Sequence, residues 1–332
     1  MDVLPRVVLA DRLFMTPSAM KILESDTEVI WAPNNDEEFL LKVRDAAVIV
    51  AEYHRITDHV MDAAVKSLRG IVAYGVGYDH IDVQAATERG LYVANCRGAN
   101  SEAVAELAVT LMLGVSRGTH IGDRFVRDGL WERNKSLSDM KGRELAGKAL
   151  GLVGMGEIGR RVVRICKGFD MRIIVFDPYL SRDQIRQAGA EPADLTTVMK
   201  EADYVSIHAP LTSETRGLIG ETEFALMKPS AYLINTARGA IIVEKALIDA
   251  LRNRRIGGAG LDVFPAEPLS ASSPLVSLDN VILSPHIGGL TEEAIAEMSR
   301  VTAEESVRIA QGRVPINLIN RNDLAAKGIA VS

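Results

Sequence analysis

Short apolar segments alternate with amphipathic helical segments along the chain, and this alternation limits the possible folds more than any other feature. Before Asn100 the apolar segments are RVVLA, TEVIWA, AAVIVAE, GIVAYGVG and LYVANC. The segments between them with helical patterns are PSAMKILES, DEEFLLKVRD, Asp58 to Leu68 and Val83 to Arg89. Strands joined by helices run parallel, because each helix returns the chain to the same edge of the sheet. The first part of the chain is therefore predicted to be an α/β layer structure.

A second alternation of the same kind follows a long helix. This helix is predicted to begin near Asn100 or Ser101, with an apolar face that includes Val104, Leu107 and Leu111. Six strand segments come next: ALGLVGMG, MRIIVFD, DYVSIHAP, AYLINTAR, GGAGLDVF and NVILSPH. With helical segments between them, they predict a doubly wound parallel sheet. A last helix is expected from Thr291 to Gln311, followed by the tail VPINLINRN.

Charge, hydropathy and cysteine content exclude several classes of protein. The formal net charge of -6 gives no attraction for polyanions, so a nucleic acid is not expected as a partner. No apolar run approaches the ~20 residues that cross a bilayer, and the first residues lack a signal peptide. The two cysteines, Cys96 and Cys166, are too few for a disulfide framework and lack metal-ligand spacing. We therefore expect a cytoplasmic protein without a metal centre.

The segment GLVGMGEIG contains a glycine pattern that is typical of phosphate-binding turns. Gly154, Gly156 and Gly159 follow a predicted strand and open a predicted helix. Glycines at these positions allow a tight turn, close approach of the backbone to a pyrophosphate, and close packing of helix on strand. The helix N-terminus then presents N–H groups to the anion. Taken alone, the pattern also fits a purely structural turn.

Asp177 strengthens the dinucleotide interpretation. It ends the next predicted strand, in VFDPY, about 20 residues after the middle glycine, where an acidic side chain can accept hydrogen bonds from ribose hydroxyls. Its carboxylate would repel a 2′-phosphate, so NAD is favoured over NADP. Arg160 and Arg161 weaken this exclusion slightly.

Three ionisable residues follow predicted strands of the second sheet: Arg238, Glu267 and His286. Hydride exchange between a nicotinamide and a carbonyl or hydroxyl carbon needs a group that gives or takes a proton at the oxygen, and an imidazole does both near neutral pH. A neighbouring carboxylate would orient the imidazole and favour its protonated form. An arginine would bind a substrate carboxylate in a fork and polarise the adjacent carbonyl. Together they predict a dehydrogenase site.

Each of these residues also has a structural explanation. A single arginine or glutamate at a strand end is more often part of a surface ion pair. His208, in VSIHAPL, occupies an equivalent strand end and competes with His286 for the acid/base role. Spacing alone does not separate these two histidines. For the remaining histidines we expect solvated surface positions: His54, His59, His80 and His120.

The motifs resemble those of the D-isomer-specific 2-hydroxyacid dehydrogenases, which include phosphoglycerate dehydrogenases and hydroxypyruvate and glyoxylate reductases. The matching segments cover nearly the whole chain and are GVGYDHID, GANSEAVAELAVTLML, LGLVGMGEIGRRV, HAPLTSETRGLI, LINTARGAIIVEKAL, GAGLDVFPAEPL and SPHIGG. The resemblance implies that Arg238, Glu267 and His286 are the catalytic residues, and that His208 lies beside the cofactor instead.

The resemblance also implies the positions that bind NAD and substrate. Besides the three glycines and Asp177, the cofactor contacts would be Glu157, Ile158, His208, Pro210, Thr212, Thr215, backbone groups of Thr236 and Ala237, and Asp262 at the nicotinamide carboxamide, with Ser101 and Val104 at the border. Backbone N–H groups of Gly75, Val76 and Gly77 would bind the substrate carboxylate, as in an anion-binding nest. A plain tight turn is the alternative for this glycine loop.

The same resemblance implies the domain arrangement and the oligomeric state. A Rossmann NAD-binding domain, residues 100–286, would be inserted into a flavodoxin-like substrate domain formed by residues 1–99 and 287–332. The two would close on substrate about hinges at Cys96 to Ser101 and Ile287 to Gly289. A homodimer would form through the helix at Ser101 and the following arm, including Trp131; a tryptophan in the core is the alternative.

Three functions are compared on this basis. The first is reduction of hydroxypyruvate, glyoxylate or a similar small 2-keto acid, or oxidation of the D-2-hydroxy acid. The second is 3-phosphoglycerate dehydrogenase. Against it, Ala51 and Ala73 stand where members of that branch tend to carry basic residues, although Arg55 or Arg133 could substitute for them, and the chain ends too early for the regulatory domain that many of those enzymes append. The third is an NAD(H)-sensing interaction protein, which would bind a protein partner rather than turn over a substrate.

Overall fold

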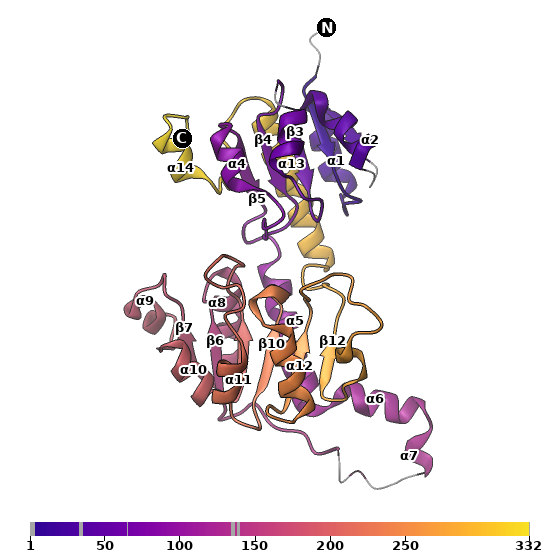
Figure 1. Ribbon diagram of the computed structural model, residues 1–332, viewed down its shortest axis with the longest axis vertical. Helices are drawn as coiled ribbons and strands as arrows, with labels where there is room; N and C mark the ends of the chain where they lie inside the picture. The colour runs from indigo at the N-terminus through magenta and orange to yellow at the C-terminus, as the bar shows by residue number, and fades with distance from the viewer. Residues whose placement is uncertain (1–3, 33–35, 65, 134–136, 138–139, 332) are drawn as a thin grey trace. The chain divides into compact units, whose positions relative to one another are not determined.

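The chain forms two compact units, each an α/β layer structure (Figure 1). The computed structural model describes residues 4–32, 36–64, 66–133, 137 and 140–331. One unit consists of Met1–Asn100 and Gly289–Ser332, and the other is Ser101–Gly288. The chain therefore passes from one unit into the other twice, after Asn100 and after Gly288.

The sheet of the first unit has five strands, as the sequence predicted. They are β1 (Arg6–Leu9), β2 (Glu28–Trp31), β3 (Ala46–Ala51), β4 (Gly70–Ala73) and β5 (Tyr92–Asn95). Their order is β2-β1-β3-β4-β5, and all neighbouring strands are parallel. Every residue of the central strand β3 is buried, as expected for a parallel strand with helices on both faces.

Helices cover both faces of this sheet. One face packs against α1 (Pro17–Asp26) and α13 (Glu292–Ala310), and the other against α2 (Asp36–Lys42), the 3-10 turn Val43–Asp45, α3 (Asp58–Ala63) and α4 (Val83–Glu88). From Val48 onward the residues of β3 alternate between the two faces: Val48 and Val50 belong to the core with Leu23 and Met298, whereas Ile49 lies in the other core. This period of two is the strand geometry that buries both faces.

The structure adds one pairing to the first unit and shortens one helix. In the expected tail VPINLINRN, Leu318 forms an antiparallel bridge with Ala94 of β5, and α14 (Arg321–Ala326) follows. The helix expected from Asp58 to Leu68 ends at Ala63, after which Leu68 donates to the carbonyl of Ala64 in a turn. Pairing of a tail with a distant strand edge leaves no local pattern, which is why the periodicity did not predict it.

The second unit has seven parallel strands, one more than predicted. They are β6 (Ala149–Val153), β7 (Arg172–Phe176), β8 (Glu191–Pro192), β9 (Tyr204–Ile207), β10 (Tyr232–Asn235), β11 (Gly258–Leu261) and β12 (Val281–Leu283). The additional strand β8 has two residues, one of them proline, and lies at the edge, where a missing N–H is tolerated. The order β12-β11-β10-β9-β6-β7-β8 reverses between β6 and β9, the topological switch point at which ligands of such sheets bind.

Helices again cover both faces of the second sheet. One core contains residues of α5 (Ser101–Arg117), α8 (Glu157–Lys167) and α9 (Arg182–Gln187), and the other contains residues of α10 (Leu195–Glu201), α11 (Glu221–Leu226) and α12 (Glu244–Arg252). The 3-10 turns Gly239–Ile241 and Pro274–Ser277 complete the unit. Within the described residues no helix has the length and apolar character of a membrane span.

An arm of two helices follows α5. It consists of α6 (Thr119–Arg127) and α7 (Leu130–Arg133). Several of its apolar side chains are exposed in the single chain, with Val126 53% and Trp131 55% accessible. The alternative of a core tryptophan is therefore excluded.

Candidate active site

The three predicted catalytic residues follow three adjacent strands. Arg238 comes after β10, Glu267 after β11 and His286 after β12, and these strands are neighbours in the sheet. Parallel strands end at a common edge, so their C-terminal loops share one region. The structure brings Glu267 and His286 into contact: Oε2 of Glu267 lies 2.7 Å from Nδ1 of His286.

Glu267 is held by its own loop as well as by His286. Its Oε1 accepts a hydrogen bond of 2.8 Å from the backbone N–H of Phe264. Burial favours the protonated carboxyl, but the hydrogen bonds from His286 and Phe264 and the charges of His286 and Arg238 outweigh it and lower the pKa of Glu267. The carboxylate is therefore ionised at neutral pH and available to orient an imidazolium.

His286 has an unusual backbone conformation that depends on Asp262. Its φ of 55° is left-handed, a region that non-glycine residues seldom adopt. The backbone N–H of His286 donates to the carbonyl oxygen of Asp262 over 2.9 Å. The buried carboxylate of Asp262 accepts from Ser284 Oγ and Ile287 N–H on Oδ1, and from Gly288 N–H, at 2.9 Å, on Oδ2. Asp262 thus fixes the turn that presents His286.

Arg238 lies on a loop that is packed directly against the loop of Glu267. The buried side chain of Asn235 spans the turn, accepting from Ala237 N–H and donating to the carbonyl of Arg238. A Cβ on Gly239 would lie 2.0 Å from the carbonyl carbon of Phe264, so only glycine permits this approach. The guanidinium of Arg238 donates to the carbonyl of Ala237 over 2.8 Å. The backbone thereby sets the separation of the arginine and glutamate loops.

The glycine turn after β6 has the geometry of a phosphate-binding turn. Gly154 has φ 92°, and a Cβ there would lie 2.8 Å from the backbone nitrogen of Ala209. A Cβ on Gly159 would lie 2.6 Å from the carbonyl oxygen of Gly154. Both glycines are thus explained by contacts within the chain, whereas a Cβ on Gly156 would meet no protein atom within 4 Å. Gly156 precedes α8, whose first residues are Glu157 and Ile158, so the space beside it suits an anion at a helix N-terminus.

Asp177 takes part in the same turn. Its Oδ2 accepts from the N–H of Met155 over 2.8 Å, and its Oδ1 accepts from the N–H of Tyr179 over 2.9 Å. A carboxylate has about four acceptor positions, so both oxygens retain capacity for ribose hydroxyls. Arg161, one of the two arginines considered in the NADP question, is engaged elsewhere, with Glu157 at 2.9 Å and Glu102 at 3.3 Å.

His208 has a buried ring that disfavours the charged form. Its Nε2 lies 2.8 Å from Oγ of Ser206, and burial lowers the pKa of His208 to about 3. A histidine that stays neutral throughout the physiological range is a poor proton donor to a carbonyl. Burial therefore disfavours His208 as the acid catalyst, a point that spacing had left open.

Two of the buried side-chain polar atoms that lack a hydrogen-bond partner belong to predicted cofactor contacts. In the described part of the chain, buried Nδ1 of His208 and Oγ1 of Thr236 have no hydrogen-bond partner. Such atoms normally find a partner, which a bound ligand can supply. Nearby, Oγ1 of Thr215 donates to the carbonyl of Pro210 over 2.6 Å, which holds the loop after β9. Together with the space at Gly156, these residues fit a nicotinamide dinucleotide.

The glycine loop of the first unit follows β4. Gly75 has φ 120°, which explains the glycine at this position. The carbonyl of Gly75 accepts from Cys96 N–H, and the carbonyl of Val76 accepts from Nδ2 of Asn95. The loop, with Gly77 after it, is therefore held by the residues that end β5.

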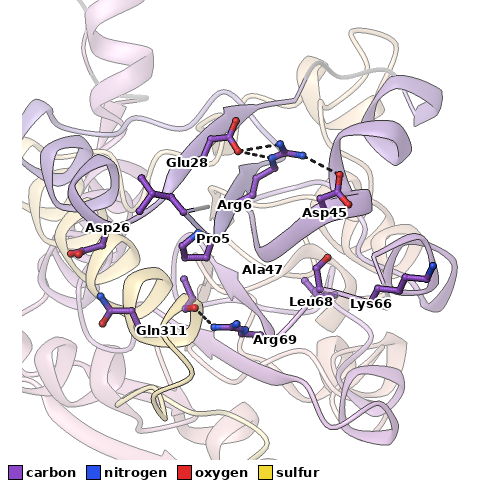
Figure 2. Close-up of a pocket in the computed structure, with 13 residues that line it drawn as sticks. Pro5, Arg6, Asp26, Glu28, Asp45, Ala47, Lys66, Leu68, Arg69 and Gln311 are labelled. Atoms are coloured by element: carbon purple, nitrogen blue, oxygen red, sulfur yellow. Dashed lines mark hydrogen bonds and ion pairs between the residues drawn. The ribbon is translucent and has the colours of Figure 1, made fainter. Parts of the chain in front are cut away.

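A separate pocket of about 770 Å³ lies at the opposite, amino-terminal edge of the first sheet (Figure 2). Arg6 on its wall forms ion pairs with Glu28 and Asp45, and Arg69 donates to the carbonyl of Ala310. Its charged side chains are balanced in sign, and none of the predicted site residues lines it.

Cys96 and Cys166 are free thiols, and within the described residues no cluster of three potential metal ligands occurs.

The remaining histidines only partly match their predicted surface positions. His59 is exposed, but His54, His80 and His120 are half-buried. The ring of His54 packs 4.0 Å from that of Phe39, and Nε2 of His80 and of His120 lies near a backbone carbonyl oxygen. Each of these three rings thus contacts another part of the chain.

Comparison with known proteins gives consistent matches. A family model described as "D-isomer specific 2-hydroxyacid dehydrogenase, NAD binding domain" matches residues 109–288. A glyoxylate reductase from Aeropyrum pernix is 42% identical over 327 residues, covering 96% of each chain. A D-3-phosphoglycerate dehydrogenase from Methanocaldococcus jannaschii is 42% identical over 305 residues, which are 91% of this chain and 57% of that protein.

Solved structures match as well. The structure of an NADPH-dependent glyoxylate/hydroxypyruvate reductase from Sinorhizobium meliloti, in complex with NADP and malonate, superposes with a TM-score of 0.84. It shares 26% sequence identity with this chain, and the match covers 95% of this chain and 96% of that one.

Proposed function

This chain belongs to the D-isomer-specific 2-hydroxyacid dehydrogenase family, and on that premise we propose that it reduces glyoxylate, hydroxypyruvate or a similar small 2-keto acid with NADH. The main support is the contact of 2.7 Å between Glu267 and His286. These two residues and Arg238 follow three neighbouring strands of the sheet. A bound nicotinamide coenzyme supplies the hydride in reduction and accepts it in oxidation.

The side chains of His286, Glu267 and Arg238 then have separate roles in proton exchange and substrate binding. Because Nδ1 of His286 is engaged by Glu267, Nε2 is the atom that exchanges a proton with the substrate oxygen. Glu267 stabilises the imidazolium that donates in the reductive direction. Arg238 binds the substrate carboxylate and polarises the neighbouring carbonyl.

The proposal extends to the groups around the reacting atoms. Oδ2 of Asp262, which accepts from Gly288, has capacity for one more donor and would take the carboxamide N–H of nicotinamide. Backbone groups of Thr236 and Ala237 would lie along the dinucleotide. The loop Gly75, Val76 and Gly77 would offer backbone N–H groups to the substrate carboxylate.

NAD is the proposed coenzyme rather than NADP. Asp177 ends β7 beside the glycine turn, and its charge opposes a 2′-phosphate. Arg161 is occupied by two glutamates and does not offset that charge. The Sinorhizobium meliloti relative uses NADPH, so the two coenzymes must be compared directly on this chain.

A small substrate without a phosphate fits better than 3-phosphoglycerate. Ala51 and Ala73, which end β3 and β4, are completely buried and carry no cation for a phosphate. Because the Methanocaldococcus jannaschii relative is a D-3-phosphoglycerate dehydrogenase, 3-phosphoglycerate is included among the substrates to be measured.

A homodimer is also part of the proposal. The exposed apolar side chains of the arm, above all Val126 and Trp131, are of the kind that protein interfaces cover. Light scattering of the intact chain and of Trp131→Glu tests this, because a charge in a buried interface should produce monomers.

The decisive experiment follows absorbance at 340 nm with NADH and NADPH in parallel. The substrates are glyoxylate, hydroxypyruvate, pyruvate and 3-phosphoglycerate. Faster oxidation of NADH with a small 2-keto acid supports the proposal. Binding of NADH without turnover on any of these acids contradicts it and favours the NAD(H)-sensing alternative. A strong preference for NADPH contradicts the role of Asp177.

A further inference from the structure

Tyr179 and Glu214 form a hydrogen bond that the proposed reaction does not use. The hydroxyl of Tyr179 donates to Oε2 of Glu214 over 2.8 Å. The two residues belong to different loops: Tyr179 follows β7 and Glu214 follows β9. The ring of Tyr179 is 76% exposed, so packing in the core does not account for the contact.

The strand order places this contact across the glycine turn. In the sequence of strands β9-β6-β7, the strand that carries the turn lies in the middle. On one side the N–H of Met155 donates to Asp177 in the loop after β7. On the other side the turn packs against the loop after β9, since a Cβ on Gly154 would lie 2.8 Å from the nitrogen of Ala209. The loops of Tyr179 and Glu214 therefore flank the turn, and their hydrogen bond joins them.

Both ends of the bridge are anchored. The N–H of Tyr179 donates to Oδ1 of Asp177, the proposed ribose ligand. The N–H of Glu214 donates to Oγ1 of Thr212, and Thr212 N–H donates to Oγ1 of Thr215 over 2.8 Å. The carboxylate of Glu214 also raises the pKa of Tyr179, so the phenol keeps its proton and remains a donor at neutral pH. The bridge thus has defined geometry despite its exposure.

We infer that Tyr179 and Glu214 form a clasp over the adenosine end of the bound dinucleotide. This inference rests on the proposed function, because it places the pyrophosphate at Gly156 and the adenosine ribose at Asp177. From there the adenosine lies between the loops after β7 and β9, under the contact that joins them. The clasp must open for the coenzyme to enter or leave, and when closed it retains the bound coenzyme.

The clasp therefore acts on coenzyme release and not on hydride transfer. Loss of one hydrogen bond of this kind corresponds to a roughly two- to tenfold change in an equilibrium constant. Tyr179→Phe keeps the ring but removes the donor, and Glu214→Ala removes the acceptor. Each variant is expected to raise the Kd of NADH by roughly two- to tenfold, mainly through faster dissociation.

The test is a double-mutant cycle with NADH as the probe. NADH fluorescence gives Kd, and stopped-flow displacement gives the dissociation rate for the intact chain, the two single variants and the double variant. If the residues act as one clasp, the double variant loses no more than the larger single loss, because the bond is broken only once. Tyr92→Phe is the matched control, since it removes an exposed tyrosine hydroxyl that donates to the carbonyl of Ala330 over 2.9 Å.

Three results would overturn the clasp: unchanged dissociation of NADH in both single variants, losses that multiply in the double variant, or an equal loss in Tyr92→Phe. All three results can be obtained only if the intact chain binds NADH. An intact chain that fails to bind NADH would instead contradict the proposed function itself, so the two failures are distinguishable.

Discussion

Oε2 of Glu267 and Nδ1 of His286 are 2.7 Å apart; Oε1 of Glu267 also accepts from Phe264 N–H, and the backbone beside His286 is fixed by the bond from Ile287 N–H to Asp262. The contact orients the imidazole ring through Nδ1. The side chains remain about 30% exposed, so a substrate can reach them from the edge of the sheet. This contact, the turn behind it and the glycine turn after β6 lead to five predictions.

His286→Ala should lower turnover by about two or more orders of magnitude, the usual scale for loss of an acid/base catalyst. NADH binding should change little, because the proposed role is proton exchange. Steady-state kinetics and NADH fluorescence measure the two quantities. His59→Ala is the matched control, since His59 is exposed and outside the predicted site. Turnover of His286→Ala close to that of the control would refute the assignment.

Glu267→Gln should lower kcat/KM for reduction by roughly tenfold or more, with little change in NADH affinity. The amide keeps the size of the side chain but removes the charge of the hydrogen bond to Nδ1 of His286, and a hydrogen bond to a charged group contributes about 1.5–3 kcal/mol. The measurement is kcat/KM for reduction with the best substrate, beside an NADH titration. A value of kcat/KM equal to that of the intact chain would contradict the role of the carboxylate.

The same substitution should alter acid stability. The folded-state pKa of Glu267 lies below its ordinary value of 4.5, so the ionised carboxylate stabilises the fold above that pH, and this contribution is lost as pH falls through the lowered value. Urea unfolding of both proteins at neutral pH and below pH 4.5 should therefore show a difference that shrinks with acid. A difference that grows on acidification would contradict the lowered pKa.

Ser284→Ala should reduce turnover more than coenzyme binding. The hydroxyl of Ser284 is one of three donors to the buried carboxylate of Asp262, which holds the left-handed backbone of His286. Removal of a hydrogen bond to a charged group costs about 1.5–3 kcal/mol of stability. Denaturation midpoints and kcat test this together. Ser25→Ala, at an exposed helix end, is the control; equal effects in both variants would remove the link to His286.

Gly156→Ala and Gly159→Ala should separate binding from folding. A Cβ on Gly156 meets no protein atom, so the variant should keep the melting temperature of the intact chain but bind NADH weakly, because the methyl group occupies space needed by the pyrophosphate. A Cβ on Gly159 collides with the carbonyl of Gly154, and overpacking of this kind costs about 1–3 kcal/mol. Thermal unfolding and NADH titration distinguish the two. Normal NADH affinity in Gly156→Ala would argue against a phosphate at this turn.

The alternation of strands and helices was sufficient to predict the layers and nearly all strands, because parallel strands buried on both faces are continuous apolar segments. It did not predict β8, which is short and contains a proline, or the pairing of Leu318 with Ala94. Both features lie at the edge of a sheet. Which strand forms an edge is determined only when the whole sheet assembles, so the local sequence does not predict it.

The chemistry of the site followed from residue types at strand ends, but their mutual geometry did not. The sequence placed Arg238, Glu267 and His286 after strands, and only the strand order makes those strands neighbours. Ser284 and the contact between Tyr179 and Glu214 were missed entirely. A serine before a proline, or a tyrosine and a glutamate far apart in sequence, carries no recognisable pattern, so only coordinates reveal these contacts.

The division of the first unit between the two ends of the chain has a consequence for biosynthesis. The strands β1 to β5 leave the ribosome early, but α13, which buries Met298 and Val307 against them, is translated only after the whole of Ser101–Gly288. The contiguous unit can therefore fold first. Until α13 arrives, only α1 of the two helices on that face is present, so the apolar side chains that α13 later covers are exposed, and the nascent chain in that interval is the form most exposed to aggregation and most suited to chaperone binding.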